Sequence, residues 1–238
     1  MKKNTLALLF LVCVSLTLCT TESVFSDAVL VNSELKNIYM KDVINKTNMK
    51  ITKKIGTQLI FNTNEKTRVW DDDNYNKVIS SNVSPAQERR FKEEEEVDIY
   101  ALIKSYSVIC KEQYNYVDGG LIKTSDREKL DSTIYMNIFG EQIPLKEQSK
   151  YKITFQNKFV TFQEIDVRLR KSLMSDNRIK LYEHNSICKK GYWGIHYKDN
   201  TTKFTDLFTH PNYTDNETID MSKVSHFDVY LNEEFSKN

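Results

Sequence analysis

The sequence is poor in the residues that build the commonest metal and redox motifs. Its four cysteines include no CxxC pair, which argues against a four-cysteine zinc site or a thioredoxin-like centre. It also has no HExxH motif, the pattern by which two helical histidines hold a catalytic zinc. With 34 basic and 33 acidic residues its formal charge is +1, and this balance argues against a general affinity for nucleic acid or anionic membrane.

Long apolar runs are also scarce, and the one at the N-terminus is too short to span a bilayer comfortably. Lys2 and Lys3 precede a mostly apolar run over residues 6–18, and Val24-Phe25-Ser26 is a plausible cleavage site. We therefore predict a signal peptide over residues 1–26 and a secreted, extracellular protein. The alternative is that the segment is retained as an N-terminal anchor.

The chain that remains after export is about 210 residues long, enough for one large domain or two small ones. Thirteen tyrosines and twelve phenylalanines indicate a β-rich chain with adhesive surfaces. Only Cys110 and Cys188 survive export. They could pair in an oxidising setting, but two cysteines give no spacing pattern, and two free thiols fit the sequence equally well.

The segment Val224–Leu231 carries the pattern with the most specific chemistry. Strand residues alternate between two faces, so His226 and Asp228 share one face while the apolar residues between them share the other. Two steps along a strand separate the pair by about 6.5–7 Å, within reach of one bound ion. An imidazole nitrogen and a carboxylate oxygen both suit zinc. A pair that is merely solvated is the alternative.

Two helices are indicated by apolar residues at three- and four-residue steps. The first is predicted over Asn32–Lys46. The second begins at the capping box Thr161-Phe162-Gln163-Glu164, in which the threonine hydroxyl and the glutamate carboxylate can satisfy each other's backbone amides. It ends at Asp176-Asn177, and its apolar stripe leaves Arg170 to one side.

Alternating or short apolar segments predict strands in the rest of the chain. In the second half the order is strand, strand, long helix and several strands, which suits a mixed sheet with one helix laid across it. The polar, charged residues 123–132 are predicted to link two domains. The predicted strands cover residues 57–61, 97–103, 134–138, 142–145, 151–155, 179–182, 192–197, 204–208 and 224–231.

One stretch of the second half resembles a known family signature. Val160–Asp166, followed by Arg170, Leu173 and Leu181-Tyr182, is similar to the helix signature of the staphylococcal enterotoxins and streptococcal pyrogenic exotoxins, the bacterial superantigens. The chain departs from the family at Asn157, where lysine is usual, and it lacks the short disulfide loop of many enterotoxins. Further similar segments are Phe91-Lys92 with Val97–Tyr100, Asp118–Leu121, Thr205–Phe208 and Tyr213–Asn216.

The resemblance implies a mostly β, α+β fold of two domains. The first would be an OB-type Greek-key β-barrel over residues 49–125. The second, over residues 126–238, would be a β-grasp domain with one long helix across a mixed sheet. Residues 27–48 would form a helical segment that packs near the domain junction. The resemblance also implies that the protein is not an enzyme.

A subset of this family binds Zn²⁺ through a His-x-Asp on the last strand and one further histidine. His226 and Asp228 match the pair, and His196 matches the third position best, because the glycine-to-histidine segment 191–196 is similar to a family strand. Strand alternation also places His196 on the face opposite the apolar residues of that segment. His210 is the next candidate and His184 the third.

Two histidines and one aspartate leave the fourth tetrahedral position of zinc open, for water in a hydrolase or for a partner's ligand. The resemblance implies that a histidine of the MHC class II β-chain fills it, and that the protein bridges MHC class II to T-cell receptor Vβ and so activates T cells non-specifically. One alternative is a superantigen-like immune-evasion protein that binds complement, immunoglobulin or leukocyte receptors. A secreted zinc hydrolase is another. A zinc-linked homodimer is a variant of the MHC-bridging superantigen function.

Overall fold

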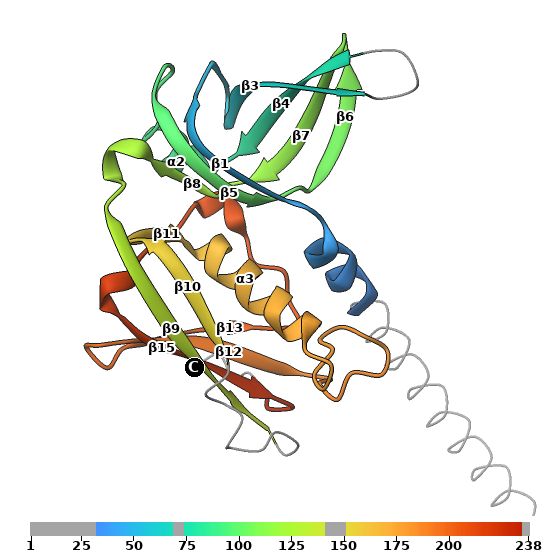
Figure 1. The fold of residues 1–238 in the computed structure, drawn as a ribbon, viewed down its shortest axis with the longest axis vertical. Helices are drawn as coiled ribbons and strands as arrows, with labels where there is room; N and C mark the ends of the chain where they lie inside the picture. The colour runs from blue at the N-terminus through green and yellow to red at the C-terminus, as the bar shows by residue number, and fades with distance from the viewer. Residues whose placement is uncertain (1–31, 69–73, 141–150, 235–238) are drawn as a thin grey trace, which may run out of the picture.

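The computed structural model describes residues 32–68, 74–140 and 151–234. Two β-rich domains stack along the long axis of the molecule, and the long helix α3 lies in the second domain, below the first (Figure 1). The described part of the chain is therefore mostly β with a few helices, as predicted. Among these residues, no helix combines the length and the apolar character that crossing a membrane requires.

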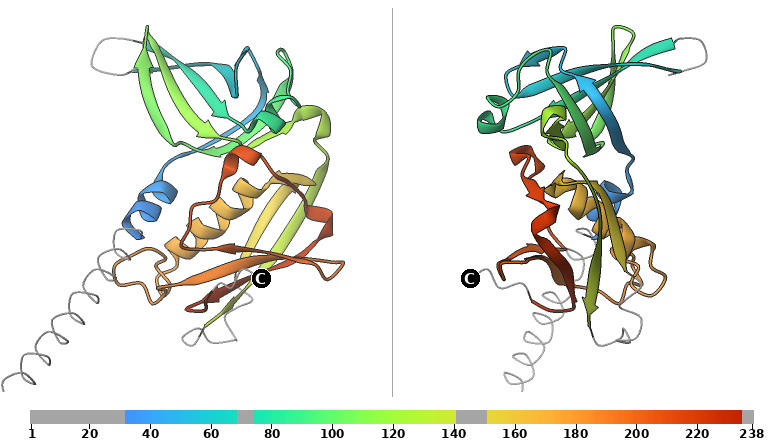
Figure 2. Two further views of the ribbon diagram at one scale, coloured as in Figure 1. Left: turned by 180° about the vertical axis from the view of Figure 1, so that it is seen from behind. Right: turned by 60° about the vertical axis from the view of Figure 1, so that its left-hand side comes forward.

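The first domain consists of two sheets wrapped around one core, visible at the top of both views in Figure 2. Buried Val97, Ile99 and Ala101 alternate with more exposed residues along β5, the period that places one face of a strand in a core. The three-stranded sheet has the order β1 (Val43–Lys50), β5 (Glu96–Leu102) and β8 (Leu121–Lys123). The five-stranded sheet has the order β2 (Lys53–Ile55), β3 (Gln58–Arg68), β4 (Asn74–Asn82), β7 (Glu112–Asp118) and β6 (Ser105–Ile109), and the short helix α2 (Pro85–Glu88) follows β4.

The second domain is a mixed five-stranded sheet with α3 packed on one face (Figures 1 and 2). Its last described strand, β15, pairs parallel with β9 and antiparallel with β12, so it lies in the middle of the sheet. The strand order is β10 (Lys152–Asn157), β9 (Lys129–Phe139), β15 (Val224–Leu231), β12 (Gly191–Tyr197) and β13 (Thr202–Asp206). A two-stranded sheet, β11 (Phe159–Thr161) with β14 (Thr218–Asp220), and the 3-10 turns η1 (Thr124–Asp126), η3 (Tyr213–Asp215) and η4 (Met221–Lys223) complete it.

Helix α3 (Phe162–Ser175) begins and ends where the sequence predicts. The Thr161 hydroxyl accepts a hydrogen bond from the Glu164 amide at 3.2 Å, which forms one half of the predicted capping box. The Glu164 carboxylate pairs instead with Arg168, at 2.7 Å. The predicted apolar stripe is buried against the sheet, and the packing of this stripe supplies most of the helix's stability.

Arg170, which the apolar stripe leaves to one side, is fully buried in the structure. Its Nε donates to the Asp166 carboxylate at 2.7 Å, and its guanidinium also donates to backbone carbonyls of residues 206, 207 and 209. Asp166 accepts further hydrogen bonds from Tyr39, on the helix of residues 32–40, and from Trp193, on β12. One buried ion pair therefore ties the N-terminal helix, α3 and β12 together.

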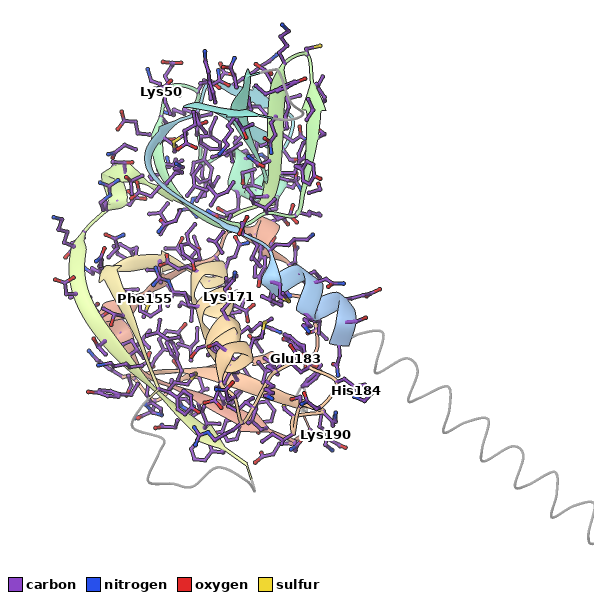
Figure 3. The ribbon with its side chains drawn as sticks, turned by 45° about the vertical axis from the view of Figure 1, so that its right-hand side comes forward. Lys50, Phe155, Lys171, Glu183, His184 and Lys190 are labelled. Carbon is purple, nitrogen blue, oxygen red and sulfur yellow. The ribbon has the colours of Figure 1, made fainter. Side chains whose placement is uncertain are left out.

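The N-terminal helix is shorter than predicted. It covers residues 32–40 and lies beside α3 (Figure 1). Val43, the last residue at the apolar helical spacing of the prediction, instead starts β1, opposite Leu102 on β5. The prediction of helix through Lys46 was therefore wrong, because sheet pairing overrides a short apolar period. Lys36 of this helix reaches Glu183 at 2.8 Å, in the loop after α3 that Figure 3 labels at Glu183 and His184.

Two other predicted segments differ from the structure. Residues 179–182 form turns, not a strand, because Lys180 and Tyr182 have positive φ values of 48° and 68° that a strand does not accommodate. The predicted linker 123–132 holds η1 and the start of β9, since Lys129 already pairs with Asn157. The predicted strand 142–145 lies outside the described residues. Cys110 is exposed and Cys188 is buried, and both are free thiols.

Candidate metal centre

Three of the predicted site residues come from two neighbouring strands of the second domain. In the antiparallel pairing of β12 with β15, His196 lies directly opposite His226, and Gly194 lies opposite Asp228. The apolar residues between them, such as Phe227 and Ile195, point into the core and are fully buried. The alternation of strand faces therefore brings the three polar side chains to the outer face of the sheet.

The three side chains converge on one point. Nε2 of His196 lies 2.9 Å from Oδ2 of Asp228, and Nε2 of His226 lies 3.5 Å from Oδ1 of the same carboxylate. The two imidazole rings are stacked, with centroids 4.5 Å apart and an angle of 4° between their planes. One candidate ligand atom from each residue lies within 4.8 Å of the others, which is close enough for a single ion to contact all three. We call His196, His226 and Asp228 the triad.

Neighbouring side chains hold the triad in this orientation. Nδ1 of His196 lies 3.0 Å from the Thr202 hydroxyl, and Nδ1 of His226 lies 3.0 Å from the Ser225 hydroxyl. Each hydroxyl engages the ring nitrogen that points away from the carboxylate, so both Nε2 atoms remain directed at the centre of the triad. Metal-binding histidines in proteins are oriented by the same kind of contact to their second nitrogen.

The carboxylate of Asp228 is held as firmly as the two rings. The Asn137 side-chain amide, on β9, donates to Oδ1 at 2.8 Å, and the Tyr230 hydroxyl donates to Oδ2 at 3.2 Å. Burial, followed by the nearby Asp228 charge, raises the pKa of Tyr230 to about 12, which keeps the hydroxyl protonated as a donor. Asp228 itself is 6% exposed, and a carboxylate so deeply buried requires compensation of its charge.

The triad has the composition and the unsatisfied atom that a cation site requires. Nε2 of His196 is buried and has no hydrogen-bond partner, although it lies 2.9 Å from Oδ2 of the Asp228 carboxylate. A buried ring nitrogen without a hydrogen bond is unfavourable unless another group binds it. Two imidazole nitrogens and one carboxylate oxygen are the ligands that Zn²⁺ prefers among these residue types. The residues therefore fit a zinc ion.

The other two histidine candidates lie elsewhere. His210 is exposed, and its ring lies against Tyr39 and Tyr213, with centroid distances of 6.0 and 5.0 Å. His184 is exposed on the loop after α3, where Figure 3 labels it on the far side of the helix from Phe155. Of the three histidines considered for the third position, the structure thus brings only His196 to the pair.

Sequence reasoning missed the residues that support the triad from neighbouring strands. Asn137 is separated from Asp228 by 91 positions in the chain, and it reaches the carboxylate only because β9 pairs parallel with β15. Thr202 meets His196 because the two residues lie opposite each other in the pairing of β12 with β13. Strand register would have identified both residues, but register is not visible in a single sequence.

Comparison with known proteins identifies both domains. Residues 34–123 match the family model described as "Staphylococcal/Streptococcal toxin, OB-fold domain", and residues 134–231 match "Staphylococcal/Streptococcal toxin, beta-grasp domain". Exotoxin type G from Streptococcus pyogenes serotype M1 is 27% identical over 169 residues, which are 64% of this chain and 68% of the exotoxin.

Solved structures agree with this assignment. The Streptococcus dysgalactiae-derived mitogen is 93% identical, with a TM-score of 0.79 over 86% of this chain and 97% of the mitogen. Streptococcal pyrogenic exotoxin A, whose structure was described for a zinc-binding site with implications for MHC class II recognition, is 23% identical, with a TM-score of 0.64 over 84% of this chain and 92% of the exotoxin. At that identity the second likeness shows the fold alone.

These matches confirm the family resemblance and the fold class that the sequence predicts. The domains of this family are not enzymes, which agrees with the expectation for this chain. The chain belongs to the staphylococcal and streptococcal superantigen toxin family, with an OB-fold domain followed by a β-grasp domain.

Proposed function

We propose that the protein is a secreted superantigen that binds MHC class II through a zinc ion held by the triad, binds T-cell receptor Vβ through another surface, and so activates T cells non-specifically. The observation that carries the proposal is the convergence of His196, His226 and Asp228 at the surface of the β-grasp domain. Nε2 of His196, which has no hydrogen-bond partner, is directed at the carboxylate. When bound, zinc would supply a coordination position that a fourth ligand can fill.

The surroundings of the triad favour a partner's side chain, rather than a reactive water, as the fourth ligand. A hydrolytic zinc site needs a general base beside the bound water. Asp228, the carboxylate of the triad, already accepts hydrogen bonds from Asn137 and Tyr230 and faces both imidazoles, so it is engaged in holding the site. The family assignment also argues against a hydrolase.

The partner assignments follow from the family. Exotoxin relatives are secreted toxins, and streptococcal pyrogenic exotoxin A was described in terms of MHC class II recognition. By analogy we propose that a histidine of the MHC class II β-chain completes the zinc shell of this protein. A zinc-linked homodimer on the same face is the variant of this proposal. We expect the T-cell receptor surface near the N-terminal helix, at the junction of the two domains.

Binding to purified MHC class II, measured by surface plasmon resonance in zinc-replete buffer, tests the proposal. We expect His226→Ala and Asp228→Ala to reduce the affinity about a hundredfold or more, since each removes a ligand. The matched control is His184→Ala, an exposed histidine of the same domain, which should bind as wild type. Wild-type affinity in the double variant His226→Ala with Asp228→Ala would refute the zinc-dependent mode.

A cellular assay separates the superantigen from its alternative. T cells mixed with MHC class II-positive presenting cells should proliferate, and the expanded cells should be restricted to particular Vβ types. If proliferation shows no Vβ selection, the bridging function is wrong. A protein that then bound complement, immunoglobulin or a leukocyte receptor, and that carried no zinc, would be a superantigen-like immune-evasion protein.

A further inference from the structure

Aromatic side chains cover the outer face of the sheet on one side of the triad. Phe139 on β9 stacks on Tyr230 on β15, which in turn stacks on Tyr192 on β12. The ring centroids are 5.0 and 4.6 Å apart, and the ring planes differ by 16° and 19°. We call Phe139, Tyr192 and Tyr230 the aromatic row. It crosses three adjacent strands, and it contacts the triad directly through the hydrogen bond from Tyr230 to Asp228.

Phe204 on β13 joins the aromatic row to the triad. Its ring lies edge-on to Tyr192 and to His196, with centroid distances of 5.6 and 6.1 Å. Although it makes these contacts, Phe204 remains 43% exposed. A large aromatic side chain that is held by its neighbours and still open to solvent is typical of a residue used in protein recognition.

The position of the Phe204 ring depends on a glycine. Phe204 lies opposite Gly194 in the pairing of β12 with β13. A Cβ atom built on Gly194 would lie 2.7 Å from both Cδ1 and Cε1 of the phenylalanine, a distance that real side chains do not adopt. The ring therefore occupies the space above residue 194, between His196 and Tyr192, and any side chain there would displace it.

The triad determines what can cover this surface. A fourth ligand to an ion in the triad has to approach over the outer face of the sheet, because the opposite face is filled by core residues such as Trp193 and Phe227. Phe204 contacts His196 on that same outer face. A protein that delivers a ligand to the ion therefore approaches over the same face that carries Phe204 and the aromatic row. Exclusion of water by such contacts is what makes a neighbouring polar contact strong.

We propose that Phe204, the aromatic row and the triad form one docking surface, which fits a partner protein that presents a histidine beside an apolar side chain. This inference rests on the proposed zinc-dependent function and adds a second element to it. The ion fixes the position of the partner's histidine, while Phe204 packs against the apolar neighbour of that histidine and contributes to the affinity and to the choice of partner.

Two variants test the contribution of Phe204. Phe204→Ala removes the ring, whereas Gly194→Ala keeps the ring and displaces it from the face of the sheet. We expect each to weaken binding to purified MHC class II about tenfold or more, the usual effect at a recognition hot spot. Zinc content, measured by mass spectrometry of the metal, should stay at the wild-type value in Phe204→Ala. Gly194→Ala also brings a Cβ within 3.3 Å of Thr202, which orients His196, so its affinity is compared at equal zinc occupancy. Tyr106→Ala is the matched control, since Tyr106 is 72% exposed on β6 of the other domain.

The outcomes distinguish this inference from the function on which it rests. If Phe204→Ala binds as wild type while Asp228→Ala does not bind, the zinc-dependent function stands and the docking surface is wrong. If Phe204→Ala loses zinc together with binding, the ring supports the metal site and is not a contact, which also overturns the inference. If sedimentation shows that zinc and Phe204 are needed for self-association but not for MHC class II binding, the occupant is a second copy of the chain and the proposed partner is wrong.

Discussion

Two buried aspartates of the β-grasp domain have opposite surroundings. Asp166 is fully buried and accepts hydrogen bonds from Tyr39, Tyr213, Arg170 and Trp193, so donors from four parts of the chain satisfy it. Asp228 is nearly as buried, but it faces two imidazoles, one of which has a ring nitrogen without a hydrogen bond. The Asp166 carboxylate is neutralised by Arg170 and holds the fold together. The Asp228 carboxylate has no arginine or lysine beside it among its described contacts, and the only basic groups that it faces are the two imidazoles.

The largest expected effect is a loss of stability when the hydrogen-bond network around Asp166 is broken. Arg170→Ala should lower the free energy of unfolding by about 3–5 kcal/mol, because it leaves the Asp166 carboxylate buried without its ion pair. Urea unfolding followed by circular dichroism measures this effect. Arg168→Ala, which removes the more exposed pair with Glu164, should cost less than about 1 kcal/mol. Equal losses in the two variants would show that the buried network is not the stronger one.

Zinc should stabilise the protein by binding at Asp228 in the triad, and not by binding at Asp166. At a free zinc concentration one hundred times the dissociation constant, binding should add about 2.7 kcal/mol to the free energy of unfolding and raise the melting temperature accordingly. The gain should disappear with a chelator and in Asp228→Asn, which keeps the shape of the side chain but removes its charge. A zinc-dependent rise in the melting temperature of Asp228→Asn would contradict the assignment of this carboxylate as a ligand.

Removing one tyrosine hydroxyl that donates to each aspartate sharpens the comparison further. Tyr39→Phe should cost about 1.5 kcal/mol of stability, the lower end for a hydrogen bond to a charged group, because Asp166 keeps its other donors. Tyr230→Phe should change stability less, but it should weaken zinc binding about tenfold, since Tyr230 orients the Asp228 carboxylate. Calorimetric zinc titration and urea unfolding of both variants give the two readouts. A stability loss without a change in zinc affinity for Tyr230→Phe would place Asp228 with Asp166 as a structural residue.

The contrast between the two aspartates was only partly visible in the sequence. Strand alternation placed His226 and Asp228 on one face and His196 on the matching face of another strand, because the period of two is local information. The hydrogen-bond network around Asp166 was missed, because the search for a buried helical face considers only apolar residues and Arg170 is charged. Its burial depends on acceptors from Asp166 and from the backbone carbonyls of residues 206 and 207, at the end of β13, which only the tertiary fold supplies.

Register and backbone conformation account for the remaining differences. Nothing near Asn137 or Gly194 in the sequence shows that they lie beside Asp228, because that depends on which strands pair and in which register. The apolar residues at 179–182 are buried in the core, but they lie in turns in which Lys180 and Tyr182 have positive φ values. Burial was thus predictable there, and the backbone conformation was not.

The central place of β15 has a consequence for the order in which the molecule can be built. This strand is the last one that the structure describes, yet it lies between β9 and β12 and carries both His226 and Asp228. The sheet cannot close until β15 has been synthesised, because this middle strand follows all of the sheet's other strands in the chain. Before that moment β12 has no partner on one side, and His196 has neither of the residues it faces in the triad. A variant truncated before β15 would lose the middle of the sheet together with His226 and Asp228, so uptake of zinc at the proposed site would report that this strand has been inserted.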